Sequence, residues 1–383
     1  MESPHDPSTS LTRIFRYRLH PTYKQAIELE KQLSLQCELY NAALEERIGA
    51  WNWEGRRVSY VNQCKTLTGL KEVRPEVVVC GITLCRGTLK RLDRAFSDFF
   101  KRVKAGQNPG FPRFRSARRW DSLEWRDTES WKLTKDHRLK LQGIGEIKLN
   151  YYRPHQGTPK VITVKREGTK WWLSLWCVDV ISSPLPKTGK EIGIDLGVVN
   201  IVTTSEGLLL PGNYFEAKSR ENLANAQRSL QCKQHGSNRR KRKVEEVGRI
   251  YRKAANRRKD AAHKLSRQLV NDFDFIAHED LSITKMVSTY KTNLNRSIHD
   301  AGWGNLVSMI SYKAECAGRT VVSVDPHYTS QRCSQCGHIE SANRVNQAAF
   351  KCRSCGHKDN ADVNAARNIL WAGRAQLALA SVG

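Results

Sequence analysis

The segment Ile192-Gly193-Ile194-Asp195-Leu196-Gly197 decides how the second half of the chain is interpreted. Its apolar residues predict a short buried strand, and Asp195 stands where that strand ends. Gly197 allows the chain to turn sharply, which leaves the Asp195 carboxylate exposed at the edge of the sheet. Ligand sites in open α/β sheets lie at such carboxyl ends, so Asp195 is a candidate site residue.

The elements around this segment have a recognisable order. The patterns predict strands at 191–195, 201–205, 208–210, 273–278 and 320–324, a long basic helical region at 215–270 that breaks near 235–237, and an amphipathic helix at 303–317. Three hairpin-linked strands followed by helix, strand, helix and strand is the order of an RNase H-like fold. Separate β and α/β blocks are the main alternative.

The first half of the chain has a different pattern. Residues 12–19 alternate apolar with polar or basic side chains, which predicts a strand, and Thr22 can cap the helix that follows. Helices are expected at 24–53, 59–68 and 82–103, and strands at 139–141, 147–151, 160–166 and 171–180. This order predicts a small β-barrel with a helical insertion.

Two irregular segments interrupt these elements. Pro109, Gly110 and Pro112 exclude a regular element from the basic stretch 105–119. The sequence Ser-Ser-Pro-Leu-Pro-Lys-Thr-Gly at 182–189 predicts a linker and is the strongest candidate for a domain boundary.

The charge of the chain indicates a polyanionic partner. The 383 residues carry 64 Lys and Arg against 38 Asp and Glu, a formal net charge of +26. Neutralising phosphates releases counterions and drives binding, so nucleic acid is the simplest partner, although basicity without chemistry is the alternative. No run of about 18 apolar residues predicts a spanning helix, and the polar residues 1–10 do not resemble a signal peptide. We therefore expect no membrane association and a cytoplasmic location.

Four of the 11 cysteines form two tight pairs, Cys333-x-x-Cys336 and Cys352-x-x-Cys355, each followed by Gly-His. This spacing is typical of a zinc ribbon, in which two turns present four thiolates tetrahedrally to one Zn²⁺. Four cysteine ligands leave no open position, so the site is expected to be structural. His338 and His357 are expected to lie beside the ligands or in solvent.

Two further acids complete a candidate catalytic site with Asp195. Glu279 follows the apolar strand residues 275–278, and Asp362 opens the helix after the cysteine pairs. Three carboxylates would repel one another unless divalent ions lay between them, and two Mg²⁺ ions could activate water and stabilise the leaving oxygen of a phosphodiester.

Each acid also has an ordinary explanation. Asp195 suits a turn, Asp362 suits a helix N-cap, and Glu279 could pair with a nearby cation. Asp280 is a rival to Glu279, and Asp325 at the end of the last strand is a further candidate ligand.

Several motifs together resemble the TnpB family of transposon-encoded, RNA-guided DNA nucleases, which are related to type V CRISPR effectors. They are the segments 193–197 (Gly-Ile-Asp-Leu-Gly), 279–281 (Glu-Asp-Leu), 328–331 (Tyr-Thr-Ser-Gln) and 362–369 (Asp-Val-Asn-Ala-Ala-Arg-Asn-Ile), with looser similarity at 15–22, 89–100 and 110–114. By this resemblance, Asp195, Glu279 and Asp362 match the three acids of a RuvC nuclease domain.

The resemblance implies an α+β multidomain fold, a wedge β-barrel with an inserted helical recognition lobe and then an RNase H-like (RuvC) domain with an inserted zinc ribbon. The expected divisions are a disordered N-terminus at 1–10, the wedge barrel at 11–22 and 105–182, the recognition insertion at 23–104, the RuvC domain at 190–326 and 358–372, the zinc ribbon at 327–357 and a C-terminal tail at 373–383.

The implied activity is guide-directed DNA cleavage. The resemblance implies that the protein binds a guide RNA, pairs it with double-stranded target DNA beside a short flanking motif, and hydrolyses phosphodiesters in the prokaryotic cytoplasm with two Mg²⁺ ions. A compact type V CRISPR effector, a carboxylate-triad transposase and a non-cleaving RNA-guided binding protein are the alternatives. Loss of one acid would indicate the last, and none of the three is lost.

Basic side chains are expected to contact the nucleic-acid backbone, because the chain has too few acids to balance them. The candidates are Lys90, Arg91, Arg94, Arg113, Arg115, Arg239, Arg240, Lys241, Arg242, Lys243, Arg252, Arg257 and Arg258. Beside Arg56 and Arg57, the aromatic residues Trp51, Trp53 and Tyr60 could stack on bases or fill a core, and we expect a core position for the tryptophans.

Overall fold

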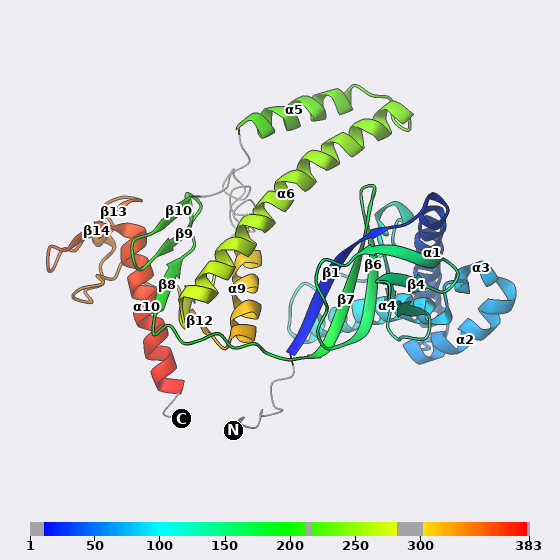
Figure 1. The fold of residues 1–383 in the computed structure, drawn as a ribbon, viewed down its shortest axis with the longest axis horizontal. Helices are drawn as coiled ribbons and strands as arrows, with labels where there is room; N and C mark the ends of the chain where they lie inside the picture. Colours follow the sequence, from blue (N-terminus) through cyan, green and yellow to red (C-terminus); the bar gives the residue numbers. More distant parts are fainter. Residues whose placement is uncertain (1–10, 212–216, 282–301, 381–383) are drawn as a thin grey trace. The chain divides into compact units, whose positions relative to one another are not determined.

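The computed structural model describes residues 11–211, 217–281 and 302–380 (Figure 1). Its contacts divide the chain into two compact units, with the division between Ile181 and Ser182. This division falls at the start of the Pro-containing segment 182–189. The N-terminal residues 1–10, expected to be disordered, lie outside the described residues.

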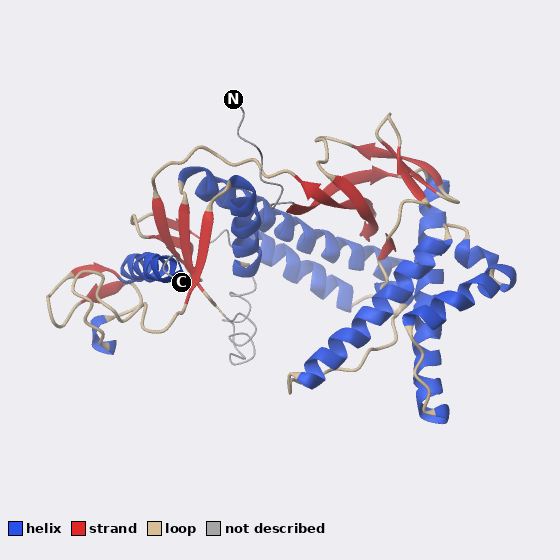
Figure 2. Ribbon diagram, turned by 90° about the horizontal axis from the view of Figure 1, so that it is seen from below, coloured by secondary structure: helices blue, strands red, loops and turns tan. Residues whose placement is uncertain are grey.

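The first unit is built on one antiparallel sheet of seven strands, which curls into a near-closed barrel (Figure 2). The strand order is β2-β6-β7-β1-β5-β4-β3. The strands are β1 (Leu11–His20), β2 (Ser122–Trp125), β3 (Trp131–Leu133), β4 (Arg138–Leu141), β5 (Gly145–Asn150), β6 (Thr158–Glu167) and β7 (Lys170–Val180). Strands β2 and β3 were not expected, because they are too short to show an alternating pattern.

The helices of this unit lie between β1 and β2 in the chain. They are α1 (Tyr23–Glu54), α2 (Tyr60–Val73), α3 (Pro75–Val78) and α4 (Ile82–Lys104). Thr22 caps α1 as expected, since its hydroxyl accepts from the Gln25 amide while the Gln25 side chain accepts from the Thr22 amide. The Trp125 indole donates to the Cys80 carbonyl at 3.0 Å, which ties the helices to the sheet.

The second unit contains a mixed sheet of five strands in the order β10-β9-β8-β11-β12. Its strands are β8 (Glu191–Asp195), β9 (Asn200–Thr204), β10 (Leu209–Pro211), β11 (Phe275–Glu279) and β12 (Thr320–Val324). The first three pair antiparallel, whereas β11 pairs parallel with both β8 and β12. This is the arrangement that the order of elements predicts for an RNase H-like sheet.

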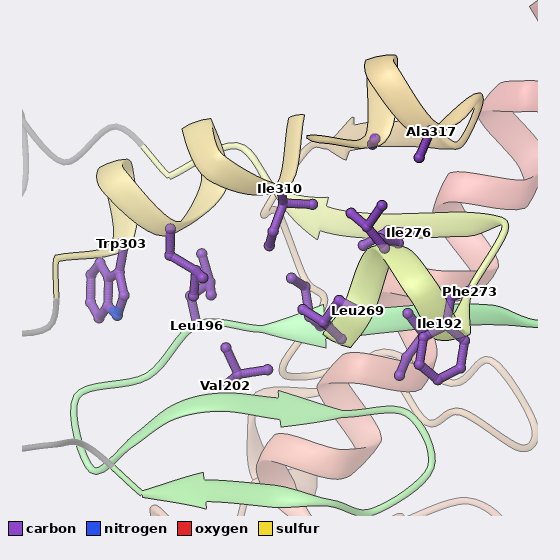
Figure 3. Close-up of a cluster of buried hydrophobic side chains, with 13 residues drawn as sticks. Ile192, Leu196, Val202, Leu269, Phe273, Ile276, Trp303, Ile310 and Ala317 are labelled. Carbon is purple, nitrogen blue, oxygen red and sulfur yellow. The ribbon is translucent and has the colours of Figure 1, made fainter. Parts of the chain in front are cut away.

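The helices of this unit are α5 (Ala217–Gln231), α6 (Asn238–Asp272), α9 (Trp303–Ala317) and α10 (Ala361–Ala380). Three of them, α6, α9 and α10, cover the two faces of the sheet, and α5 packs against α6. Side chains of α6 and α9, such as Leu269 and Ile310, pack on one face against Ile192 and Ile276 (Figure 3). Fully burying each such side chain contributes roughly 1.5–3 kcal/mol.

Helix α10 packs on the opposite face, where Ile369 meets Phe275, Ala277 and Val324. It continues to Ala380, beyond residue 372 where we expected the nuclease domain to end. Arg374 donates to Glu191, so this part of the expected tail belongs to the second unit. Residues 381–383 lie outside the described residues.

A small two-stranded hairpin separates β12 from α10. Its strands are β13 (Ala349–Lys351) and β14 (Lys358–Asn360), and the cysteine pairs flank β13. The amide of Ala361 donates to the Ala348 carbonyl at 2.9 Å, so the hairpin leads directly into the first turn of α10.

Gly193 in β8 brings the sheet and α10 into backbone contact. A Cβ atom at this position would lie 2.1 Å from the Ala366 carbonyl oxygen and 2.8 Å from the Leu370 amide nitrogen. Both atoms belong to the backbone of α10, so a side-chain rotation could not relieve the overlap. The glycine therefore fixes how closely α10, which carries Asp362, approaches the strand that carries Asp195.

We expect Gly193→Ala to lower the free energy of unfolding of the second unit by about 1–3 kcal/mol, as overpacking of a core commonly does. Gly69→Ala in α2 is the matched control, since a Cβ atom at Gly69 would have nothing within 4 Å. That control should be neutral or stabilising. Thermal unfolding followed by circular dichroism measures both, and equal melting temperatures for the two variants would contradict the packing argument.

Candidate active site and metal centre

Asp195 and Glu279 lie side by side because their strands are parallel neighbours. Ile194 of β8 is level with His278 of β11, so the two acids follow at the same edge of the sheet. The Trp303 indole donates to the Gly197 carbonyl at 3.1 Å and thereby holds the turn that follows Asp195. The expected position of both acids at strand ends is therefore the one that the structure gives them.

Asp362 lies in the first turn of α10, but it does not cap that helix. The side-chain oxygen of Asn360 accepts from the amides of Asp362 and Val363 at 3.0 and 3.2 Å, so Asn360 is the capping residue. The N-cap explanation for Asp362 is therefore wrong, and its carboxylate is available for other interactions.

The negative charges of Glu279 and Asp362 act on Asp195. Burial raises the pKa of Asp195 to about 7, and the negative charges of Glu279 and Asp362 add to that effect. Burial also raises the pKa of Glu279, while hydrogen bonding from Thr329 and the charge of Arg344 oppose the rise. A carboxylate whose pKa is raised in this way favours a nearby cation, because the positive charge offsets both the cost of burying the carboxylate and the repulsion from its neighbours.

Arg344 and Thr329 complete the site, and neither residue was predicted from the sequence. Arg344 Nη2 lies 3.1 Å from Asp362 Oδ1 and also donates to the Gln347 carbonyl. The Thr329 hydroxyl donates to the Glu279 carboxylate. Thr329 belongs to the motif at 328–331 that carries part of the family resemblance, whereas nothing distinguishes Arg344 among the many cations of this chain.

The oxygen ligands of this site suit a hard divalent cation such as Mg²⁺. In the part of the chain that the structure describes, the carboxylate oxygens of the three acids do not all lie within 4.8 Å of one another, whereas the four cysteine sulfurs do. The charges of Glu279 and Asp362 therefore act on Asp195, although the three carboxylates do not form a compact set of metal ligands.

The geometry favours these acids over their two rivals. The Asp280 side chain is exposed, and its backbone amide donates to the Val324 carbonyl. The Asp325 side chain is 73% exposed and accepts from the amide and ring of His327, which accounts for it as a turn residue. Neither contributes to the raised pKa of Asp195.

The four cysteines form a metal site of tetrahedral dimensions. Cys333 Sγ lies 3.7 Å from Cys355 Sγ, and Cys336 Sγ lies 3.6 Å from Cys352 Sγ. A tetrahedron with zinc–sulfur bonds of about 2.3 Å has edges of about 3.8 Å, so the spacing fits one structural Zn²⁺.

The two turns of this site repeat the same backbone contacts. The amides of Gly337 and Gly356 donate to the carbonyls of Cys333 and Cys352, with positive φ angles of 78° and 75° at the two glycines. This left-handed conformation favours glycine. The rings of the following histidines contact Glu340 and Asp359, and neither histidine belongs to the metal-ligand cluster.

Two buried asparagines connect the cysteine site to α10. Asn364 Oδ1 accepts from the Ser334 amide at 2.9 Å, and Asn364 Nδ2 donates to the Arg332 carbonyl at 2.8 Å. Asn368 donates to the carbonyls of Arg332 and Thr329. The cysteine site therefore supports both the start of α10 and the residue that hydrogen-bonds Glu279.

The structure separates the candidate nucleic-acid contacts into exposed side chains and side chains that stabilise the protein. Arg91 is largely buried and donates to the Ser122 carbonyl, and Arg240 donates to the Leu230 and Lys233 carbonyls at the end of α5. These two arginines therefore have structural roles.

The other cations remain accessible in varying degree. Ion pairs join Lys90 to Asp93, Arg94 to Glu124, Lys243 to Glu246 and Arg252 to Glu245. Arg257 and Arg258 have partners of their own within the protein. The remaining candidates are exposed, namely Arg113, Arg115, Arg239, Lys241 and Arg242.

The expected core position of the tryptophans is wrong. Trp51 and Trp53 are 60% and 88% exposed at the C-terminal end of α1. Tyr60 lies half-buried beneath the Lys90 ammonium group, which is 4.9 Å from the ring centre.

No helix among the described residues combines the length and apolar character that crossing a membrane requires.

Removal of zinc should unfold the segment 333–355 and loosen the start of α10, because few apolar side chains hold this segment together. Chelation followed by limited proteolysis should produce new cleavage within 333–355. Cys352→Ser should lose the bound zinc, whereas Cys232→Ser, which changes an exposed cysteine outside the cluster, should retain it. Full zinc content in Cys352→Ser, measured by mass spectrometry, would exclude this site.

Asp195→Asn should raise the melting temperature of the metal-free protein by about 2–4 °C, the shift expected from roughly 1 kcal/mol. The reason is that the raised pKa of about 7 makes the charged carboxylate destabilising. This cost is fully present above that pH, shrinks as Asp195 is protonated and vanishes below its ordinary pKa. The gain should therefore be largest near pH 8 and absent near pH 4, and a gain independent of pH would contradict the assignment.

Three family descriptions match successive parts of the chain. Residues 10–56 match "Helix-turn-helix domain", residues 167–289 match "Probable transposase" and residues 303–369 match "Cas12f1-like, TNB domain". The structure shows strand β1 and one long helix over 11–54, so no helix-turn-helix is present among these described residues.

Relatives of known name match almost the whole chain. A protein of Streptomyces pristinaespiralis named "Putative RNA-guided DNA endonuclease" is 35% identical over 370 residues, which cover 95% of this chain and 90% of the relative. "Putative RNA-guided DNA endonuclease InsQ" of Escherichia coli K12 is 32% identical and covers 95% and 93% of the two chains. A cryo-EM structure of a Cas12f1-sgRNA-target DNA complex matches with 18% identity, a TM-score of 0.36 and coverage of 94% and 99%.

The near-complete coverage at this level of identity extends the resemblance beyond the nuclease motifs to both units of the chain. The chain belongs to the TnpB family of RNA-guided DNA endonucleases.

Proposed function

We propose that the protein binds a guide RNA, pairs it with double-stranded target DNA beside a short flanking motif, and cleaves that DNA at Asp195, Glu279 and Asp362 with two Mg²⁺ ions. The observation that carries this proposal is the placement of Asp195 and Glu279 at adjacent strand ends of an RNase H-like sheet, with the charge of Asp362 acting on Asp195 from the start of α10. The names of the full-length relatives supply the guide and the substrate class.

The protein's own residues have separate tasks in this proposal. Asp195 and Glu279 present oxygen ligands from adjacent strand ends, and Thr329 orients the Glu279 carboxylate by hydrogen bonding. Asp362 supplies the third ligand from α10, at a position that Gly193 and the cysteine site maintain. Bound Mg²⁺ would activate the attacking water and stabilise the leaving oxygen of the phosphodiester.

Arg344 balances the negative charge of this cluster. It pairs with Asp362, and its charge also opposes the raised pKa of Asp195 and Glu279. A guanidinium group at this place can exchange a carboxylate for a phosphate, because each presents two oxygen acceptors that match a pair of its N–H donors.

The cations that remain wholly or partly accessible would provide the electrostatic attraction for RNA and DNA. We propose Lys90, Arg94, Arg113, Arg115, Arg239, Lys241, Arg242, Lys243, Arg252, Arg257 and Arg258 as backbone contacts. Such contacts position the nucleic acid without reading its sequence. Binding through them should weaken steeply with salt.

Asp195→Ala should reduce DNA cleavage by at least about a thousandfold, as loss of a catalytic residue commonly does. Binding of the target by the protein–guide complex should survive, because Asp195 supplies a metal ligand and no guide contact. Cleavage of labelled DNA in the presence of Mg²⁺ or EDTA, with gel-shift binding in parallel, measures both quantities.

Asp325→Ala is the matched control, since it removes an exposed carboxylate from the end of a neighbouring strand. It should cleave as the wild type does. Unchanged cleavage by Asp195→Ala would overturn the site assignment, and DNA products joined to new ends would favour the transposase alternative. A transposon protein and a compact CRISPR effector would give the same cleavage products, because their chemistry is the same. Transposon ends or a CRISPR array beside the gene distinguish the two.

A further inference from the structure

A groove in the first unit has no role in the proposed chemistry. It lies between the C-terminal end of α1, the following residues 56–59, helix α4 and Phe111, with a volume of about 840 Å³. We name it the aromatic groove after the rings of Trp51, Phe96, Phe99, Phe100 and Phe111, which line it together with Arg47. Its size is within the roughly 300–1,000 Å³ range of sites that hold small ligands.

The aromatic rings of this groove remain accessible although they pack on one another. The Phe111 ring meets the rings of Phe96 and Phe99 edge-on, with centroids 5.6 and 5.3 Å apart. Even so, Trp51 is 60%, Phe111 49% and Phe100 46% exposed. A contiguous exposed patch of large aromatic side chains usually marks a binding surface.

Arg47 adds an unsatisfied donor to the groove. Its side chain is only 8% exposed, its Nε donates to Gln63 Oε1 at 2.9 Å, and its Nη1 lies 3.7 Å from Asp93 Oδ1. No atom of the described residues accepts a hydrogen bond from Nη2. A buried guanidinium donor without a partner is unusual in a native protein. Because the Nη2 atom is itself buried, a turn of the Arg47 side chain towards the groove would bring it within reach of a ligand acceptor.

The charges around the groove favour an anionic ligand. Among the described residues, Asp93 is the only carboxylate that lines it, and Asp93 already pairs with Lys90 at 2.7 Å. Arg56 and Arg57 line the groove as well, and Arg56 pairs with Glu54 outside it at 2.7 Å. A ligand that fits must therefore combine a flat aromatic face, hydrogen-bond acceptors and negative charge, and a nucleotide has all three.

We propose that the aromatic groove binds an unpaired base of the guide RNA, stacked on Trp51 and the phenylalanine cluster, with Arg47 Nη2 donating to an acceptor of the base or its phosphate. This proposal rests on the RNA guidance proposed above. Aromatic stacking accepts any base and gains affinity without reading sequence.

RNA is the favoured source because its loops and bulges present unpaired bases at no cost of opening. Duplex DNA offers an unpaired base only after strand separation, which costs unstacking and unpairing energy. An apolar protein segment would cover the rings but would leave the Arg47 donor without an acceptor.

Trp51→Ala tests the proposal, and Trp53→Ala is its control on the same helix. Trp53 is 88% exposed, packs back towards Gly49 and does not line the groove. Both variants should fold, because both side chains are exposed, and their melting temperatures verify this. The affinity of each purified protein for the co-transcribed guide RNA is measured by filter binding without DNA. Trp51→Ala should bind about tenfold more weakly, as loss of one stacked base predicts, and Trp53→Ala should bind as the wild type does.

Ultraviolet crosslinking provides a second readout. The guide RNA should crosslink to wild-type peptides that contain Trp51 or Phe111, and the yield should fall in Trp51→Ala. Equal RNA affinity in all three proteins would overturn the proposal. So would a loss confined to DNA binding by the assembled complex, or a change in oligomeric state measured by light scattering, because these results assign the groove to DNA or to protein.

The outcome is independent of the catalytic proposal. Asp195→Ala should bind the guide RNA with wild-type affinity, since Asp195 belongs to the other unit. If the wild-type protein did not cleave DNA, the proposal for the groove would still stand. If Trp51→Ala did not weaken RNA binding, the proposal for the catalytic site would still stand.

Discussion

Backbone contact between β8 and α10 is the constraint on which the candidate active site depends. At Gly193 the strand approaches the Ala366 carbonyl so closely that no side chain could lie between them. This contact sets the distance between α10 and the sheet, and therefore the position of Asp362 relative to Asp195. Parallel pairing of β8 with β11 adds Glu279 at the same edge. Three acids far apart in the chain thereby share one electrostatic field.

The zinc ribbon stabilises this arrangement at the N-terminal end of α10. The hairpin of the ribbon runs directly into α10. The buried side chains of Asn364 and Asn368, both on α10, hydrogen-bond the backbone of the segment around the first cysteine pair. Thr329, which hydrogen-bonds Glu279, accepts one of these asparagine contacts through its carbonyl. A structural metal can thus affect an active site without touching the reacting atoms, because it fixes the elements that carry the acids.

Repulsion among the acids is offset within the protein by Arg344 and Thr329. Burial opposes the charged form of Asp195, and its neighbours increase that opposition. Such a site is destabilising in itself, and the surrounding hydrophobic core of the second unit must compensate for it. In the first unit, the exposed rings of the aromatic groove and the buried donor of Arg47 form a second departure from ordinary packing. Both departures occur where we propose that a ligand binds.

The sequence by itself predicted most of the elements, the cysteine site and three candidate acids. The spacing of Cys333 to Cys355 predicts a zinc ribbon because the ligands are local, and the pattern around Asp195 predicts a strand end because side-chain alternation is local too. Only the tertiary structure chose Glu279 over Asp280, assigned the helix cap to Asn360 instead of Asp362, and brought Arg344 to the acids. It also exposed Trp51 where composition favours burial. These outcomes depend on contacts between residues distant in the chain, which no local pattern records.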